Sequence, residues 1–425
     1  MLTREKTLRD QLLIREGDAF DARLLAESER ILRSNKYLYD ASIAATKNGD
    51  GGIDVLVKTK DVWSFTPEIS VSRKGGENKT IFGVEESNLF GKGILVLFSR
   101  SDDVDRTSTA FEYVDRNIGH HRIAFALRTA NNSDGHSHQI NLARPFFALD
   151  TRRAGGTSFY DDDRRGAFYS LGDEVAEYRH ERALHSAYFG WSSGLRNDWV
   201  RRWTAGVVHD ENRFSAPSNA TLPVLLPIDR KLVYPYVGLE ILEDRFEKST
   251  NSDQIDRSED FYLGTRLTAS LGYASRDFGS DRNAFIYSTA ISRGYGTLGR
   301  RALLISAATG GRLESGRSAN SLSRVNTRLY WRQSEKRLFV ASIDALHGQA
   351  LDLDSRIAIG GDSGLRGYPL RYQTGESRLL ISLEQRYFTD LYPFRLFRVG
   401  GAVFFDAGRS WGANPAGGPK LGWLR

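Results

Sequence analysis

A glycine-rich segment near the C-terminus carries side chains suited to a built polar site. It runs from 359 to 369, and its four glycines surround one arginine, Arg366, and one tyrosine, Tyr368, which is typical of a tightly turning loop. Two alternating strands are predicted after it, and their polar faces carry Glu384 and Asp406. Because a guanidinium donates in a planar fork that fits carboxylates, a folded-in loop could place Arg366 against both acids.

The predicted faces of these two strands follow from period-two alternation. In the first strand, Leu379, Ile381 and Leu383 lie opposite Ser382, Glu384 and Arg386, and in the second, Val399, Gly401, Val403 and Phe405 lie opposite Ala402, Phe404 and Asp406. If the aliphatic faces point outward, both carboxylates point into a shared interior.

Three other patterns could support chemistry, and each has a simpler explanation. Residues 361–364 match the short signature around a serine-protease nucleophile, but a loop and a strand surround them and no histidine has a recognisable partner motif. His136 and His138 share a strand face and could bind a metal ion, yet no third ligand is suggested. The three aspartates at 161–163 could hold calcium, but the two arginines after them favour a solvated turn. We expect no catalytic, cofactor or metal site.

Composition limits the class of protein. The 425 residues include 40% hydrophobic and 11% aromatic residues, 41 glycines and no cysteine, and the mean hydropathy is -0.43. No apolar stretch reaches the roughly 18 residues of a membrane-spanning helix. Without cysteine there is no disulfide and no thiolate metal site. The net charge of +6 is spread along the chain without a basic tract, so we expect no nucleic-acid partner.

Residues 1–60 predict a small α+β unit. Thr3 is expected to cap a first helix and Asp21 a second, whose leucines fall on one face. A β-hairpin follows, with arms at 37–46 and 53–60 and a glycine-rich turn between them. Because a sheet of two strands is marginal, we expect a further strand that precedes this sequence.

Residues 61–425 alternate with period two and predict one large β-domain. Roughly fourteen segments of about ten residues carry aliphatic side chains on one face and arginines on the other, and that length crosses a bilayer when tilted. One such segment is 261–273. The low mean hydropathy is consistent with a barrel, because every second residue of a barrel strand is polar. The polar stretches 249–259 and 312–323 are expected to be loops at the water-exposed ends.

A soluble sandwich or propeller is the main alternative fold. Strands of such proteins average about five to six residues, and their outer face is charged, whereas here the aliphatic face is uncharged over long spans. We therefore predict a mainly β chain, an antiparallel transmembrane β-barrel preceded by the small α+β unit. Candidates for the aromatic girdles at the membrane interfaces are Trp63, Trp191, Trp203 and Trp411.

Several of these segments together resemble the BamA/TamA family of outer-membrane assembly proteins. The loop motif that resembles the family's inward-folded loop is Gly364, Leu365, Arg366, Gly367 and Tyr368. Residues 383–384 and 404–408 resemble the strands that meet that loop, and residues 88–93 resemble the turn after the second barrel strand. Residues 144–147 are similar to a Pro-aromatic segment that ends a later strand. The α-α-β-β unit resembles a POTRA domain that has lost its first strand.

The resemblance implies a location and a role. The barrel would lie in the bacterial outer membrane with its N-terminal unit in the periplasm, and would insert or translocate other β-rich proteins without an enzymatic reaction. A POTRA edge strand would pair with an extended client, and a lateral seam between the strand near 63–71 and the last strand would offer it a template. Expected partners are the lipid bilayer, unfolded outer-membrane client proteins, and periplasmic or lipoprotein subunits. Arg366 would bind Glu384 and Asp406 in the lumen and keep it organised.

The sequence also departs from the family pattern. No signal peptide opens it, it holds less than one POTRA domain, and the family's barrel of the 16-strand type continues beyond the strand around Asp406. We therefore expect truncation at both ends, with about three closing strands missing. Because the candidate strands already approach that number, we expect some to be loop hairpins, or the barrel to be unusual.

Two other membrane functions stay open. A two-partner secretion transporter shares the plan of a POTRA unit followed by a barrel, and exports one dedicated passenger. A passive porin-like channel would need no POTRA unit and would give steady conductance in planar bilayers.

Overall fold

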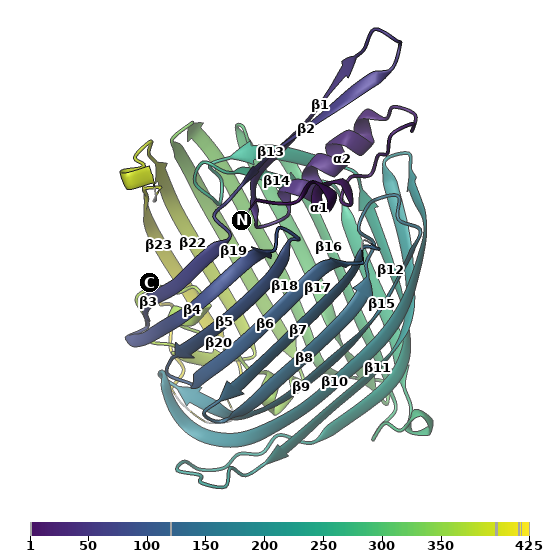
Figure 1. Cartoon of the computed structure of the whole chain (residues 1–425). Coiled ribbons are helices and arrows are strands. Elements are labelled where there is room, and N and C mark those ends of the chain that lie inside the picture. Colours follow the sequence, from purple (N-terminus) through teal and green to yellow (C-terminus); the bar gives the residue numbers. More distant parts are fainter. Residues whose placement is uncertain (1, 120, 396–397, 415–416, 418, 425) are drawn as a thin grey trace.

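The computed structural model describes residues 2–119, 121–395, 398–414, 417 and 419–424 (Figure 1). One large antiparallel sheet, curved into a barrel, dominates the molecule, and a small N-terminal unit lies at one end of it. We name that end the N-terminal mouth. The alternation therefore predicted the dominant secondary structure correctly.

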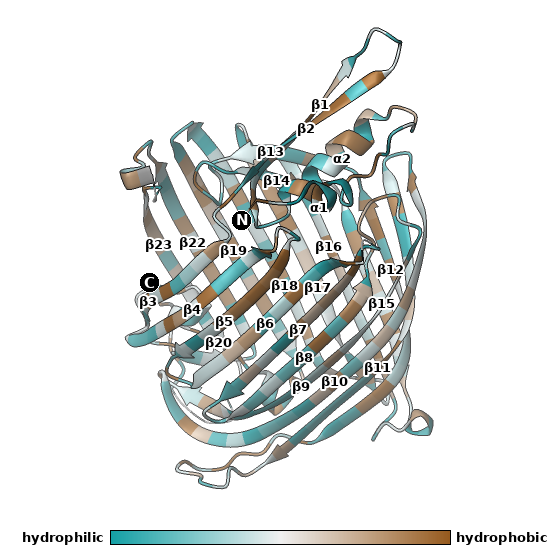
Figure 2. Cartoon of the chain, in the orientation of Figure 1, coloured by the Kyte–Doolittle hydropathy of each residue, from teal (hydrophilic) through white to brown (hydrophobic). Residues whose placement is uncertain are grey.

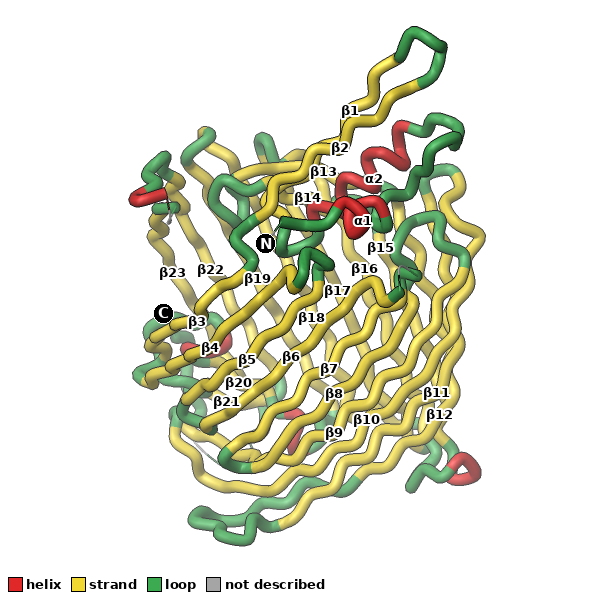
Figure 3. Tube along the Cα trace, viewed as in Figure 1, coloured by secondary structure: helices red, strands yellow, loops and turns green. Residues whose placement is uncertain are grey.

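The N-terminal unit has the predicted α-α-β-β order. Its elements are α1 (Glu5–Arg9), α2 (Ala22–Arg33), β1 (Leu38–Lys47) and β2 (Ile53–Asp61). Asp21 caps α2 as predicted, by accepting a hydrogen bond from the backbone of Arg23 at 2.9 Å. The cap predicted at Thr3 is wrong, because Thr3 donates its hydroxyl to the carboxylate of Asp61 and α1 begins after Arg4 without a side-chain cap. In the described part of the chain, β1 and β2 pair with each other alone, and their tip projects away from the barrel (Figure 3).

Turns at the N-terminal mouth hold this unit in place. The carbonyl of Gly91 accepts hydrogen bonds from the backbone of Arg4 at 2.9 Å and from the hydroxyl of Thr7 at 3.0 Å. Gly91 has a φ of +70°, and a Cβ there would lie 2.5 Å from the carbonyl oxygen of Leu2. Only glycine therefore fits this contact, which explains the glycines in the turn at 88–93.

Seventeen strands form the barrel sheet of the described residues, and consecutive wall strands from β3 to β23 pair antiparallel. They are β3 (Phe65–Lys74), β4 (Glu77–Leu89), β5 (Ile94–Asp102), β6 (Thr107–Ile118), β7 (Ile123–Asn132), β8 (Gly135–Arg144), β9 (Arg153–Ser170), β10 (Asp173–Arg196), β11 (Trp199–Ser215), β12 (Arg230–Glu243), β15 (Arg266–Ala274), β16 (Ala284–Thr297), β17 (Arg301–Glu314), β18 (Arg317–Ser334), β19 (Arg337–Gln349), β22 (Ser377–Phe388) and β23 (Gly400–Trp411). Two hairpins lie outside this sheet, namely β13 (Phe246–Thr250) with β14 (Ser258–Tyr262), and β20 (Ile357–Ile359) with β21 (Gln373–Gly375).

The strands are more numerous than the roughly fourteen predicted, and several are longer. β10 has 24 residues and β9 has 18, and the aspartates at 161–163 lie inside β9, so the predicted turn there is wrong. The predicted loop at 312–323 is the end of the β17–β18 hairpin, where Arg312 is buried. Polar side chains do not end these strands because they face the interior and pair with one another, as Arg312 does with Asp352 at 2.9 Å.

The predicted single strand at 261–273 is divided. Its first residues belong to β14 and its later ones to β15, with a break between Tyr262 and Arg266. The predicted loop at 249–259 belongs largely to the β13–β14 hairpin. A hairpin outside the barrel wall shows the same alternation of apolar and polar residues as the wall strands. Periodicity therefore does not distinguish the two kinds of strand.

Hydrophobic and hydrophilic residues are interspersed along the wall strands (Figure 2), and the alternation places the apolar side chains on the outer face. Large apolar side chains exposed there include Phe98, Ile140, Phe159, Phe189, Val237, Leu271, Ile291, Val325, Ile343 and Val403. The alternating residues carry arginines and carboxylates toward the interior, as in the ion pair between Arg324 and Asp344. Among the described residues, no helix is long and apolar enough to cross a membrane.

Candidate functional site

The segment between β19 and β22, residues 350–376, folds against the inner face of the wall, and we name it the inward loop. It contains the β20–β21 hairpin. Leu365 is fully buried and packs in one cluster with Ile359 and Leu380. Gly364 has a φ of +102°, and a Cβ there would lie 2.8 Å from the side chain of Leu380. This turn therefore requires glycine, and it directs the next residue, Arg366, toward β22 and β23.

Arg366 meets both predicted carboxylates. Its Nε donates to Asp406 Oδ2 at 2.7 Å and its Nη2 to Asp406 Oδ1 at 2.8 Å, which forms a bidentate pair. Its Nη1 donates to Glu384 Oε2 at 2.9 Å. The structure thus brings together three residues that are 18 and 40 positions apart in sequence.

The surroundings of Arg366 favour a fixed guanidinium. The Asp406 side chain is 2% exposed and also accepts a hydrogen bond from Ser382 at 2.7 Å. The centre of the Phe404 ring lies 3.5 Å from the guanidinium carbon, which is a cation–π contact. Hydrogen bonding to Asp406 raises the pKa of Arg366 above its ordinary value, so the loop carries this charge at every physiological pH.

Two further anchors of the loop were missed by sequence reasoning. Arg371 donates to Asp105 in the β5–β6 turn at 2.7 Å and also to the hydroxyl of Tyr169 in β9. Arg386, which the alternation placed on the inner face without a role, donates to Glu384 Oε1 at 2.6 Å. No local pattern marks an arginine and an aspartate 266 residues apart as partners, whereas the spacing of Arg386 from Glu384 was a usable signal.

The other residues of the predicted motif lie around this site. Gly367 is exposed with a φ of +89°, and the Tyr368 ring lies 5.6 Å from that of Tyr372 between centroids. A cavity of about 640 Å³ opens beside Arg366 and Glu384. The β3–β4 turn, Gly75 and Gly76, lines its outer end, so the first barrel hairpin touches the inward loop.

That contact gives a test of how the loop is held. A Cβ at Gly75 would lie 2.5 Å from Leu370 N, whereas a Cβ at Gly76 meets nothing within 4 Å. Both residues have positive φ, so a valine strains the backbone at either position by about 1–2 kcal/mol. We expect Gly75→Val to increase proteolytic cleavage within the inward loop of the detergent-solubilised protein, and Gly76→Val to leave it unchanged. Equal cleavage in both variants would mean that turn strain, not the contact, is responsible.

The remaining candidates do not join this site. His136 and His138 share one face of β8, with their rings 5.1 Å apart, as predicted. Asp161 pairs with His185 at 3.1 Å on β9 and β10. Residues 361–363 form a single 3₁₀ turn within the inward loop, and Gly364 follows it. In the described ranges, no group of three or more His, Cys, Asp or Glu side chains is arranged to hold a metal ion.

A second feature of the site is the junction between the first and last wall strands, which we name the seam. The strand order places β3 beside β23 and closes the barrel there. In the part of the chain that the structure describes, a hydrogen-bonded register joins β3 to β4 and β23 to β22, but none joins β3 to β23. Among the described wall strands, this junction is therefore the one that lacks a register of paired residues.

The backbone of β23 presents its polar groups to this seam. Gly408 exchanges both of its backbone hydrogen bonds with Leu424, at 3.0 and 2.9 Å, so its N–H and C=O point away from β22. Because hydrogen-bonding direction alternates along a strand and the β22–β23 register is unbroken, residues 402, 404 and 406 point the same way. Leu424 covers one position of this edge.

Comparisons with known proteins give weak similarity. No protein-family model and no curated protein matches the sequence. Among solved structures, BamA from Haemophilus ducreyi lacking POTRA domains 1–3 is 10% identical over 98% of this chain and 80% of that chain, with a TM-score of 0.43. CdiB from Acinetobacter baumannii is 13% identical over 96% and 72%, with a TM-score of 0.46. CdiB from Escherichia coli is 12% identical over 95% and 74%, with a TM-score of 0.44. Likeness at this level assigns neither a family nor an activity.

Proposed function

We propose that this chain is an outer-membrane barrel that inserts or translocates β-rich client proteins by pairing their strands at the seam. The observation that carries the proposal is the seam, where β3 and β23 close the barrel without the register of paired residues that joins the other neighbouring wall strands of the described chain. In hydrocarbon an unsatisfied backbone group costs several kcal/mol, so an edge of this kind favours any strand that pairs with it. The resemblance of the loop motif to the BamA/TamA family supports the same role.

The inward loop holds the strands on both sides of the seam in place. Arg366 joins the loop to β22 through Glu384 and to β23 through Asp406. These two strands form one side of the seam, and the Gly75 turn on the other side contacts the same loop. The loop therefore supports both sides of the seam from within, so the barrel can keep its shape when a client strand pairs at the seam.

The projecting tip of β1 and β2 supports a role in client capture. In the described chain this sheet has two strands, and its distal half lies beyond α2 (Figure 1). An extended segment adds to an edge of this kind by main-chain hydrogen bonds, with little demand on its sequence. We propose that the N-terminal unit lies in the periplasm and holds clients near the N-terminal mouth.

Reconstitution tests this function. Purified protein is placed in phospholipid vesicles, a urea-denatured outer-membrane barrel protein is added, and its folded fraction is followed by heat-modifiable gel mobility. We expect the client to fold roughly tenfold faster than in empty vesicles, the effect of lowering its barrier by about 1.4 kcal/mol. No acceleration, together with steady conductance in planar bilayers, would favour the passive channel. Export of a passenger across the vesicle membrane would favour the secretion transporter.

A further inference from the structure

The β13–β14 hairpin is the feature that neither the wall nor the Arg366 site explains. It leaves the sheet after β12, yet β12 pairs directly with β15 from Tyr236 to Leu242. The barrel wall is therefore complete without the hairpin. Figures 1 and 3 place it at the N-terminal mouth, between the N-terminal unit and the barrel.

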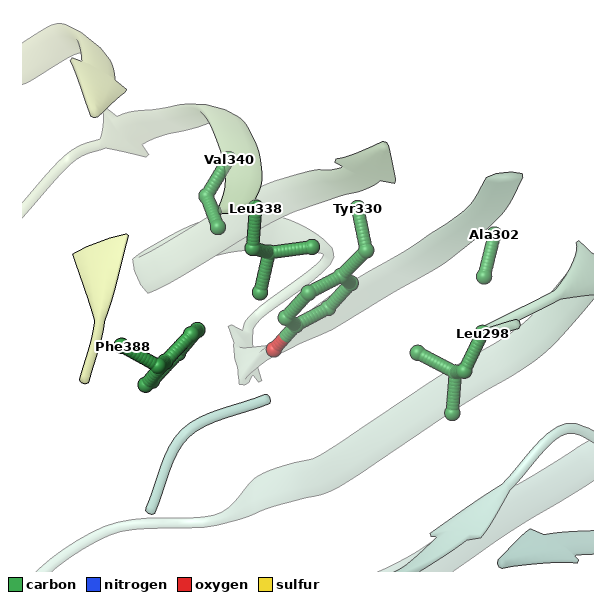
Figure 4. Packing of buried hydrophobic residues seen from close by; sticks show 6 residues of the cluster. All are labelled: Leu298, Ala302, Tyr330, Leu338, Val340 and Phe388. Carbon is green, nitrogen blue, oxygen red and sulfur yellow. The ribbon is translucent and has the colours of Figure 1, made fainter. Parts of the chain in front are cut away.

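The hairpin lies inside the mouth, because the side chains that hold it come from the inner face. Ile255 and Phe261 pack against a buried cluster that Figure 4 shows. The members of this cluster are Leu298, Ala302, Tyr330, Leu338, Val340 and Phe388. The Tyr330 hydroxyl donates to Asp253 at 3.0 Å, and Arg332 donates to the carbonyl of Asn251 at 2.8 Å.

Its other side is bound to α2. Arg33 donates to both carboxylate oxygens of Asp260, at 2.8 and 2.6 Å, and the Arg33 side chain is only 6% exposed. The guanidinium of Arg30 lies 3.6 Å from the ring centre of Phe246. The position of the N-terminal unit therefore bears directly on the hairpin.

One arginine connects the hairpin to the inward loop. Arg386 Nη1 donates to the carbonyl of Ser252 at 2.6 Å and to Asp253 Oδ1 at 2.9 Å. Its Nε donates to Glu384 Oε1, while Arg366 donates to Glu384 Oε2. The carboxylate of Glu384 thus binds Arg386, the β22 residue that contacts the hairpin, through one oxygen and Arg366 of the inward loop through the other. Withdrawal of the hairpin would therefore change the hydrogen bonding that Glu384 offers to Arg366.

We propose that the β13–β14 hairpin is a gate at the N-terminal mouth, closed in this structure, that links the N-terminal unit to the inward loop. An isolated two-stranded hairpin is marginally stable, so its position depends on the contacts with α2 and the inner wall. Movement of α2 breaks the Arg33–Asp260 pair, frees the hairpin from the mouth and releases Arg386 from it. The gate proposal depends on the proposed function in one respect, that the barrel lies in a membrane.

Single-channel conductance in planar bilayers tests the gate. The protein as it stands is expected to be closed most of the time. Asp260→Arg is expected to raise the open fraction by roughly tenfold, the effect of losing one charge-assisted hydrogen-bonded pair. Arg33→Glu is expected to raise it at least as much, because Arg33 also pairs with Glu29. The double variant, in which the charges are exchanged, is expected to have a lower open fraction than either single variant, although the carboxylate at position 33 then lies one helical turn from Glu29. Arg196→Glu, at the exposed β10–β11 turn of the same mouth, is the matched control and should behave as wild type.

A deletion variant tests whether the β13–β14 hairpin obstructs the N-terminal mouth. Replacement of residues 246–262 by a short Gly-Ser turn is expected to give a steady open level, provided that heat-modifiable mobility shows a folded barrel. If this variant does not fold, the charge exchange decides alone. A folded deletion variant with unchanged conductance, or a double variant that stays open, would overturn the gate.

Proteolysis of the inward loop tests the link to Arg366. We expect Arg33→Glu to expose the loop to cleavage at a rate several-fold above wild type, and Arg196→Glu to leave it unchanged. An open channel with an unchanged loop would overturn the coupling. Neither measurement uses client insertion, so a failure of the insertion assay with a working gate would remove the proposed function and keep the gate.

Discussion

Arg366→Ala is expected to abolish most of the client-folding acceleration while the barrel still assembles. The variant leaves Asp406, whose side chain is 2% exposed, without its bidentate partner. Loss of one partner of a fully buried pair costs about 3–5 kcal/mol. Here the cost is smaller because the Arg366 side chain is 36% exposed and water reaches it. Folding rates of the denatured client in vesicles measure the activity, and heat-modifiable mobility measures the barrel.

Two companion variants separate charge from geometry. Arg366→Lys keeps the positive charge but loses the bidentate fork, so we expect intermediate activity. Ser382→Ala removes one hydrogen bond to the same Asp406 carboxylate and leaves the arginine in place, so its effect should be small. Wild-type activity and mobility in Arg366→Ala would remove the role proposed for the loop. A barrel that loses its mobility in proportion to activity would show that Arg366 only stabilises the fold.

Proline substitutions at two neighbouring positions of β23, Val403 and Ala402, are expected to have opposite effects on barrel stability. Val403 pairs with Gln385, and its N–H points toward β22, whereas the N–H of Ala402 points toward the seam. Proline has no N–H, so it is tolerated on an edge and disrupts a paired ladder. Val403→Pro should leave a buried acceptor unsatisfied, at a cost of about 1–3 kcal/mol, and prevent stable barrel formation.

Ala402→Pro should preserve the barrel and reduce client folding about fivefold, because one template hydrogen bond is worth about 1 kcal/mol. The preceding residue is Gly401, which limits the steric conflict that proline imposes on its neighbour. Mobility on gels and client folding in vesicles give both readouts on the same samples. Full client folding by a stable Ala402→Pro barrel would show that clients do not pair with this edge.

Alternation along the chain determined the class of fold and which side chains share a face. A strand's side chains must alternate, so Glu384 and Asp406 could be assigned to the same interior from their own neighbours alone. Glycines at 364 and 367 predicted the turn that carries Arg366, because positive φ is a local property of the backbone. Local rules made the contact between these three residues possible, whereas the inward fold of the loop was implied only by the family resemblance.

The tertiary structure alone decided which segments leave the wall and which distant groups meet. The hairpin at 246–262 alternates like any wall strand, and only the direct pairing of β12 with β15 excludes it from the barrel. The partners of Arg33 and Arg371 lie 227 and 266 residues away. Such contacts arise from the curvature of the whole sheet and the closure of long loops, and neither leaves a trace in local periodicity. Strand number was underestimated for a related reason, since polar residues that pair inside a barrel imitate the polarity of loops.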